Sequence, residues 1–81
     1  MEQDNPSGSE SGKEWTLWVE NGDEYFESEQ YEEALLAYEQ SARLEPDYAP
    51  TYQRIGSMLE KLQRPDEAQV AYEQAQRLNQ S

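Results

Sequence analysis

Carboxylates are the commonest reactive side chains in this sequence, so they are the first candidates for a reaction centre. The 81 residues hold 18 aspartates and glutamates, six lysines and arginines, and neither histidine nor cysteine. Nucleophile-and-base arrangements therefore lack their usual parts. The pairs Glu20/Glu24 and Glu32/Glu33 are of a kind that performs acid–base catalysis, but only inside a pocket that shifts a pKa. A chain of four short helices offers no such pocket, so we expect no enzyme and no catalytic residue.

The sequence gives equally little support to a metal or cofactor site. Asp23, Glu24 and Glu27 are oxygen ligands close together on one predicted helix, but no calcium-binding loop surrounds them. The four glycines are scattered, so there is no glycine-rich phosphate loop. We expect no cofactor and no metal site, and at most weak, adventitious binding of divalent cations.

The charge is strongly acidic and unevenly spread. The net charge is -12, to which residues 1–14 contribute -3, residues 15–48 contribute -9 and residues 49–81 contribute zero. An acidic surface repels phosphates, which argues against nucleic acid and anionic lipid as partners. Two interpretations of the acidic part stay open: it only solvates the protein or adapts it to salt, or it forms a face for a basic partner.

Several features favour a soluble, cytoplasmic protein. No run of 18 apolar residues is present, so we expect no membrane span. The first residues, MEQDNPSGSE, are acidic and polar, unlike a signal peptide. Residues 1–12 hold few hydrophobic side chains and are predicted to form a disordered acidic tail.

Apolar residues at helical spacing predict four helices over the rest of the chain. The stripes cover residues 15–28, 31–45, 52–62 and 65–78. Pro46 lies just beyond the second stripe, and Pro65 occupies the first position of the last helix, where its missing N–H costs nothing.

The helices form two copies of one unit. AYEQSAR at residues 37–43 returns as AYEQAQR at residues 71–77, an offset of 34 residues. The same offset relates Gly22 to Gly56 and Ala34 to Ala68, which divides the chain into repeats at 15–48 and 49–81. At this period the chain resembles the tetratricopeptide repeat (TPR) family. The motif reads Trp18-x-x-Asn21-Gly22-x-x-Tyr25, Ala34-x-x-x-Tyr38 and Pro46 in the first copy, and Tyr52-x-x-Ile55-Gly56-x-x-Leu59 and Ala68-x-x-x-Tyr72 in the second.

The resemblance implies an all-α fold in which two helix–turn–helix repeats, four antiparallel helices, stack as a short right-handed α-solenoid. Two departures from the family pattern are visible. Asn21 replaces the usual leucine, and Glu29 and Gln63 replace the glycine that usually precedes the second helix of a repeat.

Small residues opposite large ones should form the core. Gly22 and Gly56 let a neighbouring helix approach closely, and tyrosines fill the space between helices. We expect the following large side chains in the core: Trp18, Tyr25, Tyr38, Leu44, Tyr72 and Leu78. The stripe of Leu35, Tyr38 and Ala42 becomes Gln69, Tyr72 and Gln76 in the second copy, which predicts a terminal cap there.

The resemblance also implies a non-catalytic protein–protein interaction module with a concave groove. The side chains that would line this groove come from the first helix of each repeat: Thr16, Val19, Glu20, Asp23, Phe26, Glu27, Gln53, Arg54, Ser57, Glu60 and Lys61. Family members that clamp a carboxylate use basic residues and asparagine where this chain has Val19 and Asp23, so we expect no such clamp. We expect instead a peptide or protein segment with lysine or arginine at one end, docked beside Phe26.

Two alternatives remain open for this surface. In the first, the groove charges only keep an exposed helix soluble. In the second, Arg54 and Lys61 pair with acids of the first repeat across the groove. For the whole chain, the alternative function is a self-assembling structural unit. Its acidic first repeat would then stack head to tail on the second repeat of another copy and form homo-oligomers.

Overall fold

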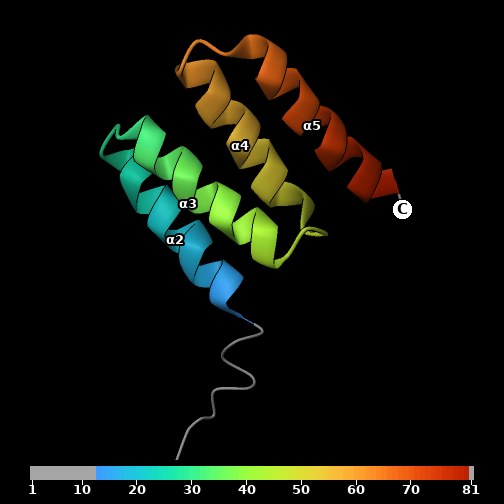
Figure 1. Ribbon diagram of the computed structural model, residues 1–81, viewed down its shortest axis with the longest axis horizontal. Coiled ribbons are helices and arrows are strands. Elements are labelled where there is room, and N and C mark those ends of the chain that lie inside the picture. The colour runs from blue at the N-terminus through green and yellow to red at the C-terminus, as the bar shows by residue number, and fades with distance from the viewer. Residues whose placement is uncertain (1–12, 81) are drawn as a thin grey trace, which may run out of the picture.

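A computed structural model describes residues 13–80 and shows four α-helices in this part of the chain. They are α2 (Glu14–Glu27), α3 (Tyr31–Leu44), α4 (Ala49–Lys61) and α5 (Pro65–Gln80), and the described residues contain no strand (Figure 1). The predicted all-α fold is confirmed. The predicted disordered tail at 1–12 lies outside the described residues.

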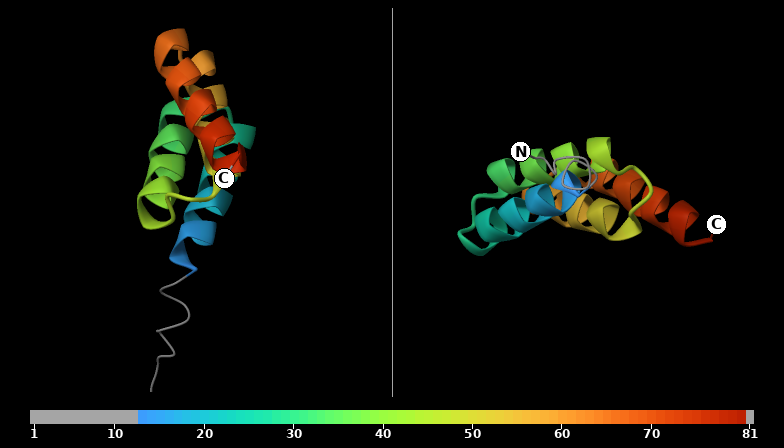
Figure 2. Two further views of the ribbon diagram at one scale, coloured as in Figure 1. Left: turned by 90° about the vertical axis from the view of Figure 1, so that its right-hand side faces the viewer. Right: turned by 90° about the horizontal axis from the view of Figure 1, so that it is seen from below.

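The helices form two antiparallel hairpins that stack side by side. Helix α2 packs against α3, α4 packs against α5, and α3 against α4 joins the two hairpins. In Figure 2, α2 and α4 lie toward one side of the molecule and α3 and α5 toward the other. The chain thus has one face made by the first helix of each hairpin and another made by the second helix.

Each hairpin turns through a residue in the left-handed region. Glu29 has φ 63° and Gln63 has φ 66°, and these are the two positions where the sequence lacks the expected glycine. After α2, Gln30 N–H donates to Tyr25 O at 2.8 Å and Glu29 N–H donates to Phe26 O at 2.9 Å. The turn after α4 repeats this pattern, with Arg64 N–H donating to Leu59 O at 2.8 Å. These bonds define a Schellman motif, which fixes the turn although no glycine is present.

Replacing Glu29 with glycine is therefore expected to stabilise the protein by about 0.5–1 kcal/mol. Glycine removes the steric cost of positive φ and gives up only an exposed side chain. Thermal unfolding monitored by circular dichroism should show a Tm rise of a few degrees. Gln76→Gly, at an exposed interior position of α5, is the control and should lower the Tm. A lower Tm for Glu29→Gly would contradict the assigned turn.

The core lies along the junction of the hairpins. It contains eight buried apolar residues: Ala34, Leu35, Tyr38, Ile55, Met58, Leu59, Ala68 and Ala71. The expected close approach at the glycines is present, because a Cβ built at Gly56 would lie 2.5 Å from Cε1 of Tyr72. Gly22 faces the Tyr38 ring in the same way.

The prediction of burial is wrong for three of the expected core residues. Trp18 is 37 % exposed, Tyr25 39 % and Leu44 49 %. Trp18 and Tyr25 lie on the side of α2 that points away from the second hairpin, where no helix covers them in the described structure. Leu44 is the last residue of α3, where the helix ends before Pro46.

Candidate functional site

The sequence predicts a concave groove on the face shared by α2 and α4, and one carboxylate lies at the centre of this face, which we call the concave groove. Asp23 of α2 accepts a hydrogen bond from the Tyr38 hydroxyl of α3 at 2.5 Å. The same oxygen, Oδ1, lies 3.3 Å from Nε of Arg54 on α4. Asp23 therefore links three helices, and Arg54 offsets its charge across the groove.

Burial and the neighbouring carboxylate keep the Tyr38 hydroxyl protonated. Desolvation is the largest cause that raises the pKa of Tyr38, followed by the hydrogen bond to Asp23 and its negative charge. The positive charge of Arg54 acts in the opposite direction and is outweighed. Tyr38 is thus a fixed hydrogen-bond donor at neutral pH and cannot serve as a base.

These residues surround a pocket of about 150 Å³ in the concave groove. Six residues line it: Asp23, Phe26, Tyr38, Arg54, Ser57 and Met58. Phe26 is 40 % exposed at this pocket and also contacts the ring of Tyr31, with the ring centroids 6.0 Å apart. The pocket accepts a single side chain and has one open aromatic surface.

The second hairpin repeats this arrangement without a cation. Ser57 takes the place of Asp23, and its Oγ lies 3.5 Å from the hydroxyl of Tyr72. That hydroxyl donates to Oε1 of Glu60 at 3.0 Å. The carboxylate of Glu60 is exposed and has no ion pair within residues 13–80.

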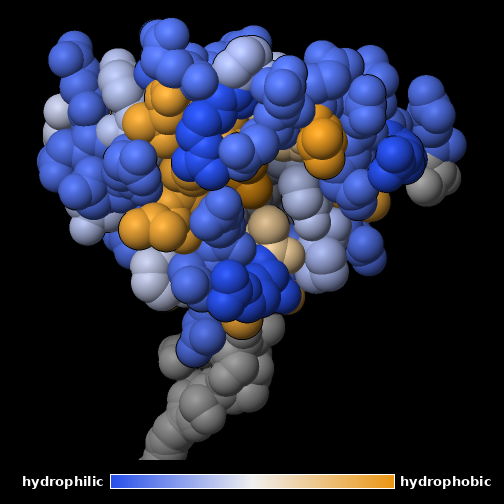
Figure 3. Space-filling view, turned by 45° about the horizontal axis from the view of Figure 1, so that its top comes forward, coloured by the Kyte–Doolittle hydropathy of each residue, from blue (hydrophilic) through white to orange (hydrophobic). Residues whose placement is uncertain are grey.

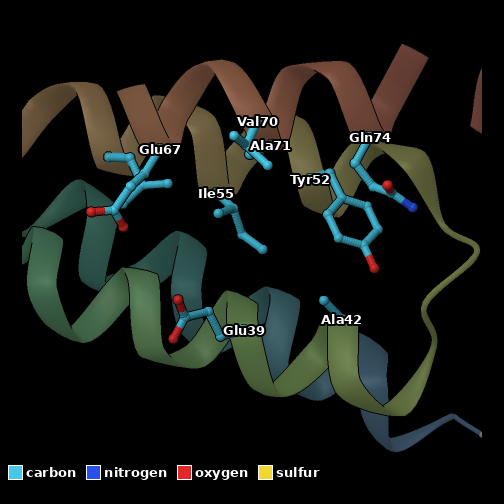
Figure 4. Close-up of a pocket in the computed structure, with 9 residues that line it drawn as sticks. Glu39, Ala42, Tyr52, Ile55, Glu67, Val70, Ala71 and Gln74 are labelled. Carbon is cyan, nitrogen blue, oxygen red and sulfur yellow. The ribbon is translucent and has the colours of Figure 1, made fainter. Parts of the chain in front are cut away.

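A second hollow, the convex groove, lies on the other face, between α3 and α5 with α4 as its floor. It has a volume of about 520 Å³ and is lined by Glu39, Ala42, Tyr52, Ile55, Leu59, Glu67, Val70, Ala71 and Gln74. Figure 3 shows hydrophobic side chains gathered in a hollow between hydrophilic ones. In Figure 4, Glu39 and Glu67 extend from opposite walls while Ile55 and Val70 lie between the helices. Sequence analysis did not predict this groove.

Comparison with known families supports the repeat assignment. A family model described as TPR repeat matches residues 22–63, and one described as tetratricopeptide repeat matches residues 49–81. The chain belongs to the tetratricopeptide repeat family. TPR repeats generally mediate protein–protein interaction and are typically non-catalytic. No curated protein and no solved structure matches the chain.

In this TPR protein, four of the expected groove residues meet at one pocket: Asp23, Phe26, Arg54 and Ser57. Glu20, Glu27 and Gln53 are exposed on the same two helices. The structure supports the expected pairing of Arg54 across the groove with an acid of the first repeat.

Three further expected groove residues, Thr16, Val19 and Lys61, do not line this pocket. Val19 packs against the core, and the Thr16 hydroxyl donates to Lys13 O at 2.7 Å in the first turn of α2. The Nζ of Lys61 lies over the Tyr31 ring, 5.8 Å from its centroid, which is a cation–π contact with α3 rather than a pairing with an acid. These three side chains have local structural contacts and stand apart from the pocket.

Sequence analysis missed two residues of the pocket, Tyr38 and Met58. Tyr38 was assigned to the core, and its ring is indeed only 1 % exposed. Its hydroxyl nevertheless reaches the groove. The sequence did hold one signal for this hydrogen bond: positions 38 and 72 are both tyrosine rather than phenylalanine, and a buried hydroxyl needs a partner.

The part of the chain that the structure describes contains neither a candidate metal site nor a candidate membrane-spanning helix. Residues 13–80 contain no group of three or more acidic residues arranged to hold a metal ion. None of the four TPR helices is long and apolar enough to cross a membrane.

Proposed function

We propose that this TPR protein is a non-catalytic adaptor that holds a partly basic segment of a partner protein in its concave groove. The observation that carries the proposal is the charge of α2. This helix has five acidic residues and no basic residue. Of the five, only Asp23 forms an ion pair within residues 13–80. An arginine or lysine of the partner would supply the missing positive charge.

The positions of these acids define where the basic side chain would lie. Glu20 and Glu27 are three residues before and four residues after Asp23, so all three share one face of α2. Both are exposed, whereas Asp23 is already occupied by Tyr38 and Arg54. The partner's cation would therefore bind Glu20 or Glu27 and leave the Asp23 pair intact.

Phe26 supplies the apolar part of the proposed contact. It borders the pocket beside Asp23 and stays 40 % exposed. An apolar side chain of the partner that entered this pocket would cover the Phe26 ring. The partner segment would thus combine a basic residue with a nearby leucine or aromatic residue, and its affinity would be modest because the groove is short.

The experiment is a titration with short fluorescent peptides that combine arginine or lysine with one leucine or phenylalanine. Anisotropy should show saturable binding at low salt, and peptides with glutamate in place of the basic residues should not bind. We expect Glu20→Gln together with Glu27→Gln to weaken binding by about tenfold. Added salt should weaken binding to the native protein more than binding to this variant.

The matched control removes the same charge from other helices. Glu32→Gln together with Glu73→Gln also changes two exposed acids, on α3 and α5, and should alter affinity by less than about twofold. Equal weakening by both pairs would show that binding follows net charge alone and would overturn the groove assignment. Failure of every basic peptide to bind would overturn the proposed function.

Head-to-tail self-assembly remains the alternative prediction, and the chemistry of the far end disfavours it. Gln69, Glu73 and Gln76 of α5 are exposed at the positions that Leu35, Glu39 and Ala42 hold in α3. Stacking a second copy there would bury two amides and a carboxylate, and the hydrogen bond from Gln69 to Glu73 satisfies only part of their polar atoms. Each copy also carries a net charge of -12, which adds repulsion.

A further inference from the structure

The open side of the first repeat repeats a surface that α3 partly covers in the second repeat. A hollow of about 290 Å³ on this side is lined by Trp18, Tyr25, Glu33, Leu36, Ala37 and Gln40. Adding 34 to each number gives six of the nine residues that line the convex groove. We call the six residues of the first repeat the outer face.

Two of the three remaining residues of the convex groove come from the helix that forms one of its walls. Glu39 and Ala42 belong to α3, which packs on α4 and closes one side of the groove. Beneath α3, Leu59 of α4 is 5 % exposed, whereas its counterpart Tyr25 on α2 is 39 % exposed. The outer face has the same design and lacks the covering helix in the described structure.

The charges of the two surfaces differ at one pair of positions. In the second repeat, the Arg64 guanidinium donates two hydrogen bonds to the Glu67 carboxylate, from Nη2 to Oε1 at 2.7 Å and from Nε to Oε2 at 3.2 Å. In the first repeat the corresponding residues are Gln30 and Glu33. Glu33 is exposed and has no ion pair within residues 13–80. The outer face therefore lacks one cation as well as one helix.

We propose that the outer face binds an amphipathic helix of a partner protein, one that carries a leucine–alanine stripe and a flanking lysine or arginine. The stripe would pack on Trp18, Tyr25 and Leu36 as Leu35 and Ala42 of α3 pack toward α4. The basic residue would pair with Glu33. This contact is separate from the concave groove, because the pocket in that groove and the outer face share no lining residue.

Segments of this chain fit the outer face poorly. Residues 1–12 contain one large apolar side chain, Met1, and so cannot supply a stripe. The exposed face of α5 in a second copy offers Gln69, Glu73 and Gln76, which are polar, and that copy carries the same negative charge. A basic helix from another protein satisfies both the apolar and the electrostatic requirement.

The probe for this test is a capped synthetic peptide with the sequence of α3, Tyr31–Leu44, in which Glu32→Lys and Glu33→Lys supply the basic flank. The protein is the full chain with Trp15→Phe, which leaves Trp18 as its single tryptophan. Trp15 lies against Tyr48, with ring centroids 4.6 Å apart, and phenylalanine preserves that ring contact. Binding should shift Trp18 fluorescence to the blue and protect it from acrylamide quenching.

Matched substitutions at the two equivalent surfaces locate the binding site. Leu36 is 60 % exposed and its counterpart Val70 is 66 % exposed, so arginine at either position should leave the fold intact, which circular dichroism checks. We expect Leu36→Arg to weaken binding at least about tenfold and Val70→Arg to change it less than about twofold. Glu33→Gln should weaken binding about threefold at low salt and have little effect at high salt.

Each of three results would overturn the proposal. The first is binding that Val70→Arg weakens as much as Leu36→Arg, which would place the peptide in the convex groove. The second is no saturable change in Trp18 fluorescence. The third is a mass, measured by light scattering, that rises with concentration in the native protein and not in Leu36→Arg, because the occupant would then be a second copy. Glu20→Gln with Glu27→Gln should leave this binding unchanged, which separates it from the concave groove.

Discussion

Replacing Gly22 with alanine is expected to destabilise the fold by about 2 kcal/mol, which corresponds to a loss of roughly 10 °C in Tm. The new Cβ would lie 2.6 Å from Cδ1 and 2.8 Å from Cζ of Tyr38, well inside van der Waals contact. Tyr38 is 1 % exposed and its hydroxyl is bound to Asp23, so its ring has no free space to enter. The gain in helix propensity from alanine, about 1 kcal/mol, offsets only part of this overlap.

Gly56→Ala is the internal comparison, because it meets Tyr72 at a similar distance. The new Cβ would lie 2.5 Å from Cε1 of Tyr72. Tyr72, however, is only partly buried and can rotate toward solvent. We expect Gly56→Ala to cost less than Gly22→Ala by at least about 1 kcal/mol. Urea unfolding of both variants measures the difference as a shift in midpoint.

A double-mutant cycle tests the cause of the loss. Tyr38→Leu shortens the side chain that the new Cβ at position 22 would strike, so Gly22→Ala should cost much less in that background, with a coupling of about 1 kcal/mol or more. Equal costs in the two backgrounds would show that the loss does not come from the Tyr38 contact. A Gly22→Ala variant as stable as the native protein would contradict the packing described for α2 and α3.

The number of helices and the glycine–tyrosine contacts could be predicted from the sequence. Both depend on local periodicity and on a repeat of 34 residues, which places Gly22 and Gly56 at equivalent positions opposite Tyr38 and Tyr72. Close packing of a neighbouring side chain is the simplest reason for a glycine to recur at the same position of an apolar helix stripe. The predictions from the sequence therefore hold for contacts between the two helices of one hairpin.

Exposure at the end of the solenoid could not be predicted in the same way. A stripe shows which side of a helix is apolar but does not show whether another element covers it. Trp18 and Tyr52 occupy equivalent positions, yet Tyr52 packs against the core beneath α3 while Trp18 stays open. The error at Trp18 and Tyr25 came from assigning equal burial to both copies, and the same error revealed the outer face.

The candidate site was predicted in part, for a related reason. The face of α2 and α4 could be inferred from the family resemblance, and Asp23, Phe26, Arg54 and Ser57 do meet there. The contact of Asp23 with Tyr38 spans 15 residues and that with Arg54 spans 31. Such pairings depend on how the hairpins stack, which periodicity does not specify. The hydroxyl of Tyr38 was consequently assigned to packing alone.

Alkaline pH is expected to destabilise the protein through Tyr38. In the unfolded chain the Tyr38 hydroxyl titrates near its ordinary value of 10.0, whereas burial and the bond to Asp23 raise its pKa in the folded state. Below pH 10 both states keep the proton, so the stabilising contribution of this group is fully present. Above pH 10 the unfolded chain releases the proton first, and stability falls by about 1.4 kcal/mol for each pH unit until the folded pKa is reached.

Tyr38→Phe isolates this contribution. The variant should lose about 1–2 kcal/mol at neutral pH, because the hydrogen bond to Asp23 is removed while Arg54 still pairs with that carboxylate. Urea unfolding from about pH 8 to about pH 12 should then show the two proteins converging above pH 10 and reversing in order by about pH 12, since only the native protein loses stability as Tyr38 ionises in the unfolded chain. Tyr52, whose pKa is raised by desolvation and by Asp47, contributes equally to both and cancels in the comparison. Parallel curves above pH 10 would mean that the Tyr38 hydroxyl reaches solvent and titrates normally, and Asp23 would then be held in the groove by Arg54 alone.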